Sequence, residues 1–241
     1  MVSSRTGTVT GLDCRGEGRV DRSAARVVAV DVGSVRTGSF AWAAVDVPGH
    51  RLTAHGDDPA GAVEALAVAL ADGSDAVLAL EAPMSVPVPE DGRLLGKSRA
   101  GEGNRAWSAS AGAGALATGL AQGAWLLAEL ARALPGLAAT TQVPRWRGTA
   151  DGGAPLLLVE AFVSGKGKPV PTALGPHAAD AEAAARAVAR RLTGEGGGTD
   201  VTCAPQRALN LLAAQARWAG LTVGGDEHTL DVLVVRARPG G

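Results

Sequence analysis

Apolar residues fall into short runs along the chain, separated by longer stretches with helical spacing. Three of the runs are almost wholly apolar, as is typical of strands buried on both faces of a sheet. They cover residues 26–31, 76–80 and 155–159. Three shorter strand patterns cover residues 39–45, 51–54 and 231–236.

Helices are expected between these strands, over residues 59–71, 116–134, 177–192 and 205–219. The first has the clearest limits, because Asp58 is a favoured N-cap, Pro59 suits a first turn and Gly73 follows the last apolar position. Residues 85–114 are rich in Gly, Pro, Ser and charge, which predicts a long loop. A strand hairpin joined to parallel strands by helices indicates an α/β fold with a mixed sheet.

The length of 241 residues is enough for one domain with its own core. Residues 1–25 are polar and charged, so we expect a disordered tail followed by a single domain over 26–241, ending in a helix and strand extension. No stretch reaches the roughly 20 apolar residues that a membrane span needs. Cys14 and Cys203 lack metal-ligand spacing and are expected to be free thiols, which favours a cytoplasmic location.

The balance of charges limits the kinds of partner. Lys and Arg number 23 against 24 Asp and Glu, for a formal net charge of −1. Proteins that hold long duplex nucleic acid are usually basic, because neutralising phosphates supplies most of their affinity. A strong, non-specific DNA-binding protein is therefore disfavoured, whereas a local basic patch is not.

Each of the three buried strand patterns is followed by an acidic residue or ends in one: Asp31, Glu81 and Glu160. Ligands collect at the carboxyl ends of strands in open α/β sheets, so these side chains are expected to converge. His177 and Asp180 lie three residues apart at a predicted helix start, which places them on one face. Converging carboxylates repel one another unless a cation lies among them, and Mg²⁺ or Mn²⁺ suits such a site. Two such ions can activate a water and stabilise the leaving oxygen of a phosphodiester.

The same residues resemble a known family. Residues 31–38, Asp-Val-Gly-Ser-Val-Arg-Thr-Gly, are similar to the first strand and turn of RuvC-type Holliday-junction resolvases and their RNase H-like relatives. Glu81 resembles their second acid, which follows the fourth strand. Residues 177–185, His-Ala-Ala-Asp-Ala-Glu-Ala-Ala-Ala, resemble their C-terminal helix. Residues 81–83 and 159–162 are also similar to an uncharacterised branch of predicted RNase H-like nucleases.

The resemblance covers residues 26–192 and implies an RNase H-like fold: antiparallel hairpin strands, then parallel strands, flanked by helices. It also implies a metal-dependent nuclease in which Asp31, Glu81 and Asp180 hold Mg²⁺ or Mn²⁺. His177 would be a ligand or a water-orienting base. Glu160 would be either a further metal ligand or a structural residue. Resolvase specificity is not implied, because the near-neutral charge and the loop after Glu81 depart from that pattern.

Basic residues in two predicted loops are candidates for contacts with substrate phosphates. These are Lys97, Arg99, Arg105, Lys166 and Lys168. The first three follow Glu81 and the last two precede His177, so all of them are expected near the acids. The alternative is that they are ordinary solvated loop charges. The expected partner is a nucleic acid of undetermined type, and a homodimer is compatible with the sequence.

Two other functions remain open. An actin-like or sugar-kinase-like nucleotide-binding protein also begins with an Asp-x-Gly strand turn, but it needs a second glycine-rich phosphate turn, which only residues 224–226 approximate. A scaffold protein that kept the fold and lost catalysis is also compatible with the alanine-rich helices. Locally, Asp31 could be only a turn-forming residue, and Asp180 could only be favoured by the helix dipole.

Overall fold

The structure is a computed structural model that describes residues 25–103, 106–146, 153–163, 168–169, 175–195 and 197–238. The tail predicted over 1–25 therefore lies outside the described residues, except for Ala25, which begins the first strand. No helix in the described ranges is both long and apolar enough to cross a membrane. Cys203 is buried with a free thiol, while Cys14 lies outside those ranges.

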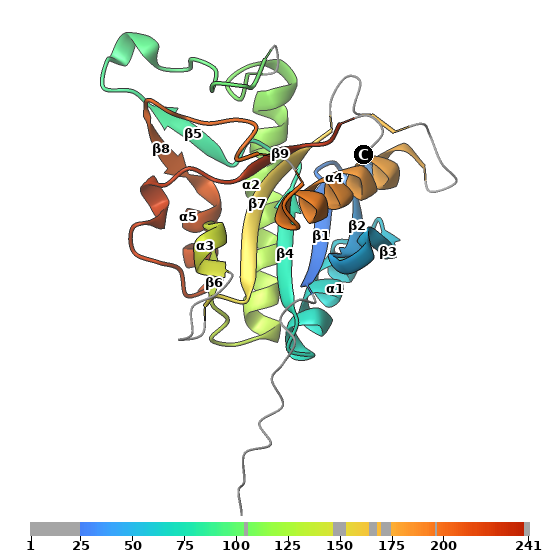
Figure 1. Ribbon diagram of the computed structural model, residues 1–241. Helices are drawn as coiled ribbons and strands as arrows, with labels where there is room; N and C mark the ends of the chain where they lie inside the picture. The colour runs from blue at the N-terminus through green and yellow to red at the C-terminus, as the bar shows by residue number, and fades with distance from the viewer. Residues whose placement is uncertain are drawn as a thin grey trace, which may run out of the picture.

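A mixed sheet forms the centre of the molecule (Figure 1). Its strands are β1 (Ala25–Asp31), β2 (Ala41–Asp46), β3 (Arg51–Gly56), β4 (Asp75–Leu80), β6 (Ala139–Thr140), β7 (Leu156–Phe162) and β9 (Val234–Arg236). The strand order is β3-β2-β1-β4-β7-β6, and β9 pairs with the end of β7. β2 pairs antiparallel with both β1 and β3. On the other side, β4 pairs parallel with β1, β7 pairs parallel with β4, and β6 and β9 both pair parallel with β7.

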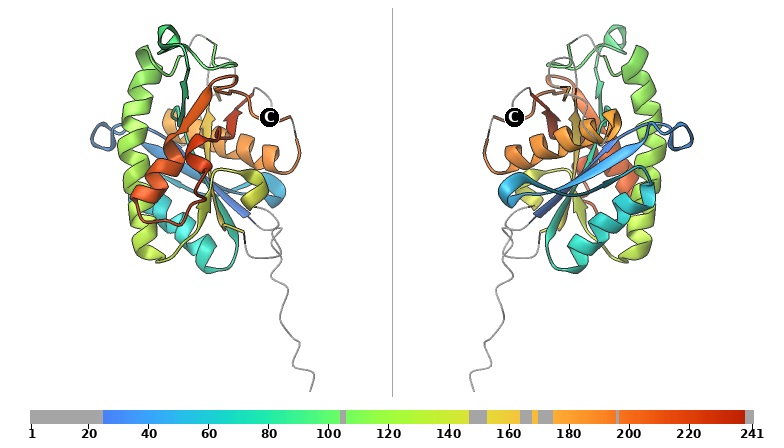
Figure 2. Two further views of the ribbon diagram at one scale, coloured as in Figure 1. Left: turned by 90° about the vertical axis from the view of Figure 1, so that its left-hand side faces the viewer. Right: turned by 90° about the vertical axis from the view of Figure 1, so that its right-hand side faces the viewer.

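Helices cover both faces of the sheet, which confirms the predicted α/β class. They are α1 (Pro59–Ala71), α2 (Ser110–Ala133), α3 (Val143–Trp146), α4 (Pro176–Leu192) and α5 (Leu211–Trp218). α1, α2 and α5 pack on the face that carries Val28 and Val30, and α4 packs on the face that carries Val27 and Ala29 (Figures 1 and 2). Because alternate strand residues enter two separate cores, these strands are apolar throughout rather than alternating.

The turn between β1 and β2 brings two backbone segments into close contact, as the glycines of this segment indicate. A Cβ at Gly33 would lie 2.0 Å from the carbonyl oxygen of Ser39, so a side chain does not fit there. Gly38 has φ +73°, which glycine adopts without strain. The Gln122 side chain of α2 donates a hydrogen bond to the Gly33 carbonyl. This turn leaves Asp31 at the very end of its strand.

Two regions differ from the sequence-based expectation. The loop predicted over 85–114 contains a strand, β5 (Ser85–Val88), and α2 already begins at Ser110. The helix predicted over 205–219 is shorter, because its first residues form β8 (Arg207–Asn210), which pairs antiparallel with β5. Asn210 then caps α5 by accepting a hydrogen bond from the Ala213 N–H. This pairing joins segments far apart in sequence, so no local pattern reveals it.

Candidate functional site

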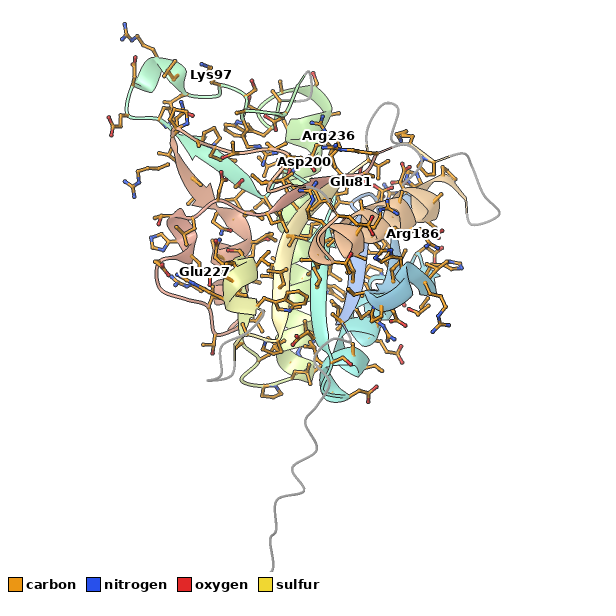
Figure 3. All side chains as sticks on the ribbon, viewed as in Figure 1. Glu81, Lys97, Arg186, Asp200, Glu227 and Arg236 are labelled. Carbon is orange, nitrogen blue, oxygen red and sulfur yellow. The ribbon has the colours of Figure 1, made fainter. Side chains whose placement is uncertain are left out.

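The predicted acids lie at the end of the sheet where β1 and β4 have their carboxyl ends. Asp31 is the last residue of β1 and Glu81 directly follows β4. The two strands are parallel neighbours, and the Glu81 N–H donates to the Val30 carbonyl over 2.9 Å. α4 begins at this edge and brings His177 and Asp180 in its first turns. Figure 3 shows Glu81 at this end of the sheet, close to α4.

Asp31 and His177 form a close pair. The Nδ1 atom of His177 lies 2.7 Å from Oδ2 of Asp31, and the two side chains are 43% and 15% exposed, respectively. Burial raises the pKa of Asp31 above its ordinary value, while the hydrogen bond and charge of His177 oppose this shift. When Asp31 is ionised and the imidazole is neutral, the proton between them is on Nδ1 and the lone pair of Nε2 is an acceptor. The imidazole therefore orients the carboxylate.

Asp180 pairs with a lysine from the segment before α4. The Lys168 ammonium donates to Oδ2 of Asp180 over 3.0 Å, and Asp180 is 8% exposed. The pKa of Lys168 is raised by this hydrogen bond and by the charge of Asp180, with smaller contributions from Glu81 and Asp31. One ammonium group is thus close enough to interact with all three acids.

Glu81 is the least satisfied of the acids. Its Oε1 accepts a hydrogen bond from the Val163 N–H over 3.0 Å, but its buried Oε2 has no partner among the described residues. Burial, followed by repulsion from Asp31, raises the pKa of Glu81 to about 8. An ionised Glu81 is therefore unfavourable in the protein alone, and a cation beside Oε2 would relieve it.

Glutamine in place of Glu81 is expected to stabilise the metal-free protein at alkaline pH. The folded pKa lies above the unfolded value, so the unfolded chain releases this proton first and stability falls as pH rises from about 4.5 to about 8. Glu81→Gln removes that loss and keeps an oxygen to accept from Val163. Urea unfolding in EDTA should show a gain of about 2 kcal/mol or more at pH 8 and little change at pH 4.5.

The matched control for this change is Glu64→Gln on the exposed side of α1, which should leave stability unchanged at both pH values. A Glu81→Gln variant that is no more stable than the wild type at pH 8 would contradict the interpretation of Glu81 as a buried carboxyl group whose ionisation is unfavourable.

The carboxylates are of a type that suits Mg²⁺ or Mn²⁺, but their side chains are not arranged as ligands. No group of three or more His, Cys, Asp or Glu side chains within the described ranges is poised to hold an ion. Asp31 is turned to His177, Asp180 to Lys168, and Glu81 to the Val163 N–H. The unpartnered oxygen of Glu81 and the repulsion among the three acids are what a hard cation with oxygen ligands would satisfy.

Glu160 lies in the interior of β7 rather than at its end, because the strand continues to Phe162. Its carboxylate is 2% exposed and receives two hydrogen bonds from Arg99, at 2.7 and 2.8 Å. The Met84 N–H donates a third, over 2.9 Å. Both oxygens of Glu160 thus have protein partners, which favours the structural alternative for this residue.

Arg99 is buried, whereas the sequence suggested a loop cation facing a substrate. Its guanidinium also donates to Glu102 and to the Ser85 carbonyl, so it joins β5, the following loop and β7. With 4% of its surface exposed, Arg99 cannot reach a phosphate in this conformation. Glu102 is not evident as a partner from the sequence, since a charged pair in a Gly-rich segment gives no sign of burial.

The remaining basic candidates are divided between two places. Lys168 lies at the site, as its bond to Asp180 shows. Lys97 is exposed on the loop beyond β5, and Figure 3 shows it well away from Glu81. Arg105 and Lys166 lie outside the described residues.

Comparisons of the chain with models of protein families, with curated proteins and with solved structures gave no match. The function of this chain is therefore inferred from its own residues and geometry.

Proposed function

We propose that this protein is a metal-dependent nuclease of the RNase H-like class, which hydrolyses phosphodiester bonds in a nucleic acid. The supporting observation is the convergence of Asp31, Glu81 and Asp180 at one sheet edge, from segments far apart in the chain. A purely structural explanation accounts poorly for a buried carboxylate oxygen without a partner beside two further acids.

The arrangement of the sheet agrees with the fold that the resemblance implies. An antiparallel hairpin begins the sheet, parallel strands extend it, and helices lie on both faces. The second acid follows the fourth strand, and the helix with His177 and Asp180 reaches the same edge. These features support the RNase H-like class in addition to the site itself.

Asp31, Glu81 and Asp180 would hold Mg²⁺ or Mn²⁺, which when bound supplies an activated water and charge stabilisation at the leaving oxygen. His177 fixes the orientation of Asp31 and can accept a proton at Nε2. The Lys168 ammonium, on its flexible side chain, can move its hydrogen bond from Asp180 to a phosphate oxygen of the substrate. Glu160 and Arg99 support the chain that follows Glu81 through the hydrogen bond to Met84.

The nucleotide-binding alternative has less support. The glycine-rich segment 224–226 is held by α3, because Arg145 makes two 2.7 Å hydrogen bonds to Asp226. The neighbouring Glu227 is buried against Thr140 and Thr141. These contacts occupy the segment that a phosphate-binding turn would need.

Calorimetry with Mn²⁺ tests the proposal against a scaffold that has lost activity. The full chain is expected to bind Mn²⁺ stoichiometrically and to cleave at least one of three substrates: single-stranded DNA, RNA or a branched junction. Cleavage should require the ion and stop in EDTA. A chain that takes up no Mn²⁺ would overturn the proposal and favour the scaffold alternative.

A further inference from the structure

A groove follows the side of α4 that faces the segment after β9. It is lined by Pro169, Ala179, Glu182, Arg186, Arg190 and Arg238, among others. The residues from α4 recur at intervals of three and four, so they form one stripe along the helix. The groove thus has a helix on one side and the chain beyond β9 on the other.

One end of the groove is lined by residues that are adjacent in sequence to the candidate site. Pro169 follows Lys168, whose ammonium contacts Asp180, and Ala179 precedes Asp180 on α4. From Asp180 to Arg190 the helix rises by about 15 Å, which is the length of about four nucleotides along one strand of B-form DNA. The groove side of α4 is thus long enough to accommodate a few nucleotides of one strand.

The charged side chains that line the groove are three arginines and one glutamate, so the groove is net positive in a chain with a formal net charge of −1. Arg186 is paired with Glu182, and Arg238 is paired with Asp200 at 2.9 Å. Asp200 also pairs with Arg191 from the end of α4. Figure 3 labels Arg186 on this helix and Asp200 beside it.

Arg190 is the distinctive member of the group. Its side chain makes no hydrogen bond or ion pair with the described residues, although it lines the groove. The helix dipole favours arginine in a last turn, but it does not explain why Arg238 from another segment faces the same groove. A guanidinium without a partner among the described residues, beside two further arginines, is suited to phosphate oxygens.

We propose that this groove binds the sugar–phosphate backbone of the nucleic acid on one side of the scissile bond, with Arg190 and Arg238 contacting phosphates. The inference rests on the proposed nuclease function and adds the path of the strand. Arg186 lines the same path while it stays paired with Glu182. The contacts are to phosphate, so this groove adds affinity without reading sequence.

Binding is measured by fluorescence anisotropy in EDTA, so that catalysis plays no part. The probe is a labelled single-stranded DNA of about 20 nucleotides, longer than the groove. The double variant Arg190→Glu with Arg238→Glu is expected to bind at least about 10-fold more weakly, because each substitution replaces a cation that neutralises a phosphate by an anion that repels it. Its log–log salt slope should also be shallower, by about 1 to 2. Stoichiometric Mn²⁺ uptake should stay unchanged.

Two further variants complete the test. Arg190→Ala removes a guanidinium that has no ion pair with the described residues, and it should weaken binding several-fold. Arg132→Glu is the control, because Arg132 is an exposed cation at the far end of α2, away from the carboxylate edge. It should leave binding unchanged.

The outcomes separate the two proposals. Unchanged DNA affinity in both groove variants, together with Mn²⁺-dependent cleavage, would overturn the proposed role of the groove but not the proposed nuclease function. A wild-type chain that takes up Mn²⁺ but binds and cleaves no nucleic acid would overturn both the nucleic-acid substrate and the groove. Equal weakening by Arg132→Glu would show that net charge, not this groove, governs affinity.

Discussion

Asparagine at position 31 is expected to abolish Mn²⁺-dependent cleavage and to weaken Mn²⁺ binding by about 100-fold or more. The change removes the negative charge that a cation needs but keeps the shape of the side chain and an oxygen that can accept from His177. Because burial already raises the pKa of Asp31, a neutral side chain is tolerated there and the fold should remain intact. Cleavage assays, calorimetry and circular dichroism measure the three effects.

Asp46→Asn is the matched control for Asp31→Asn. Asp46 ends β2 beside the start of β1, at the opposite edge of the sheet, where it pairs with Arg26 and Arg51. The substitution there removes the same charge without touching the site, so metal binding and cleavage should persist. Full activity in Asp31→Asn would refute the assignment of the site.

The largest loss of stability is expected at Arg99. Replacing it by methionine leaves Glu160 and Glu102 buried without their cation, which we expect to cost about 3 to 5 kcal/mol in free energy of unfolding. Urea unfolding measures this loss. Adding Glu160→Gln should recover a large part of it, because the amide is neutral and its oxygen can still accept from Met84.

The surface variant Arg93→Met serves as the comparison, since its pair with Asp91 is exposed and should contribute nothing measurable. If Arg99→Met lowered the free energy of unfolding no more than Arg93→Met does, the buried ion pairs of Arg99 would not stabilise this region. The double variant Arg99→Met with Glu160→Gln also tests whether Glu160 is a metal ligand. Retained Mn²⁺ binding in that protein would show that Glu160 is not a metal ligand.

Local patterns predict the centre of the fold well, because buried strands and capped helices follow from short-range physics. The apolar runs at 26–31 and 76–80 are β1 and β4, and Asp58 caps α1 through the Ala60 N–H. The parallel pairing of β1 with β4 then explains why strand-end acids meet. The five residues predicted at the site that do come together there are Asp31, Glu81, His177, Asp180 and Lys168. Their role toward metal remains a prediction.

Other parts of the site depend on contacts that no local pattern encodes. In the sequence Arg99 resembles a solvated cation, because the acids that bury it are Glu102 nearby and Glu160 on a distant strand. β5 is hidden in an apparent loop because its partner β8 comes far later in the chain and Pro87 weakens a strand pattern. Such long-range ion pairs and ribbon pairings need coordinates.

The place of α4 in the chain has a consequence for newly made protein. Asp31 and Glu81 leave the ribosome early, but His177 and Asp180 arrive only with α4, which also covers one apolar face of the sheet. A nascent chain that stops before Pro176 has two of the three acids and a bare hydrophobic surface. Under the proposed function, the cleavage site is therefore complete only after most of the polypeptide has been made.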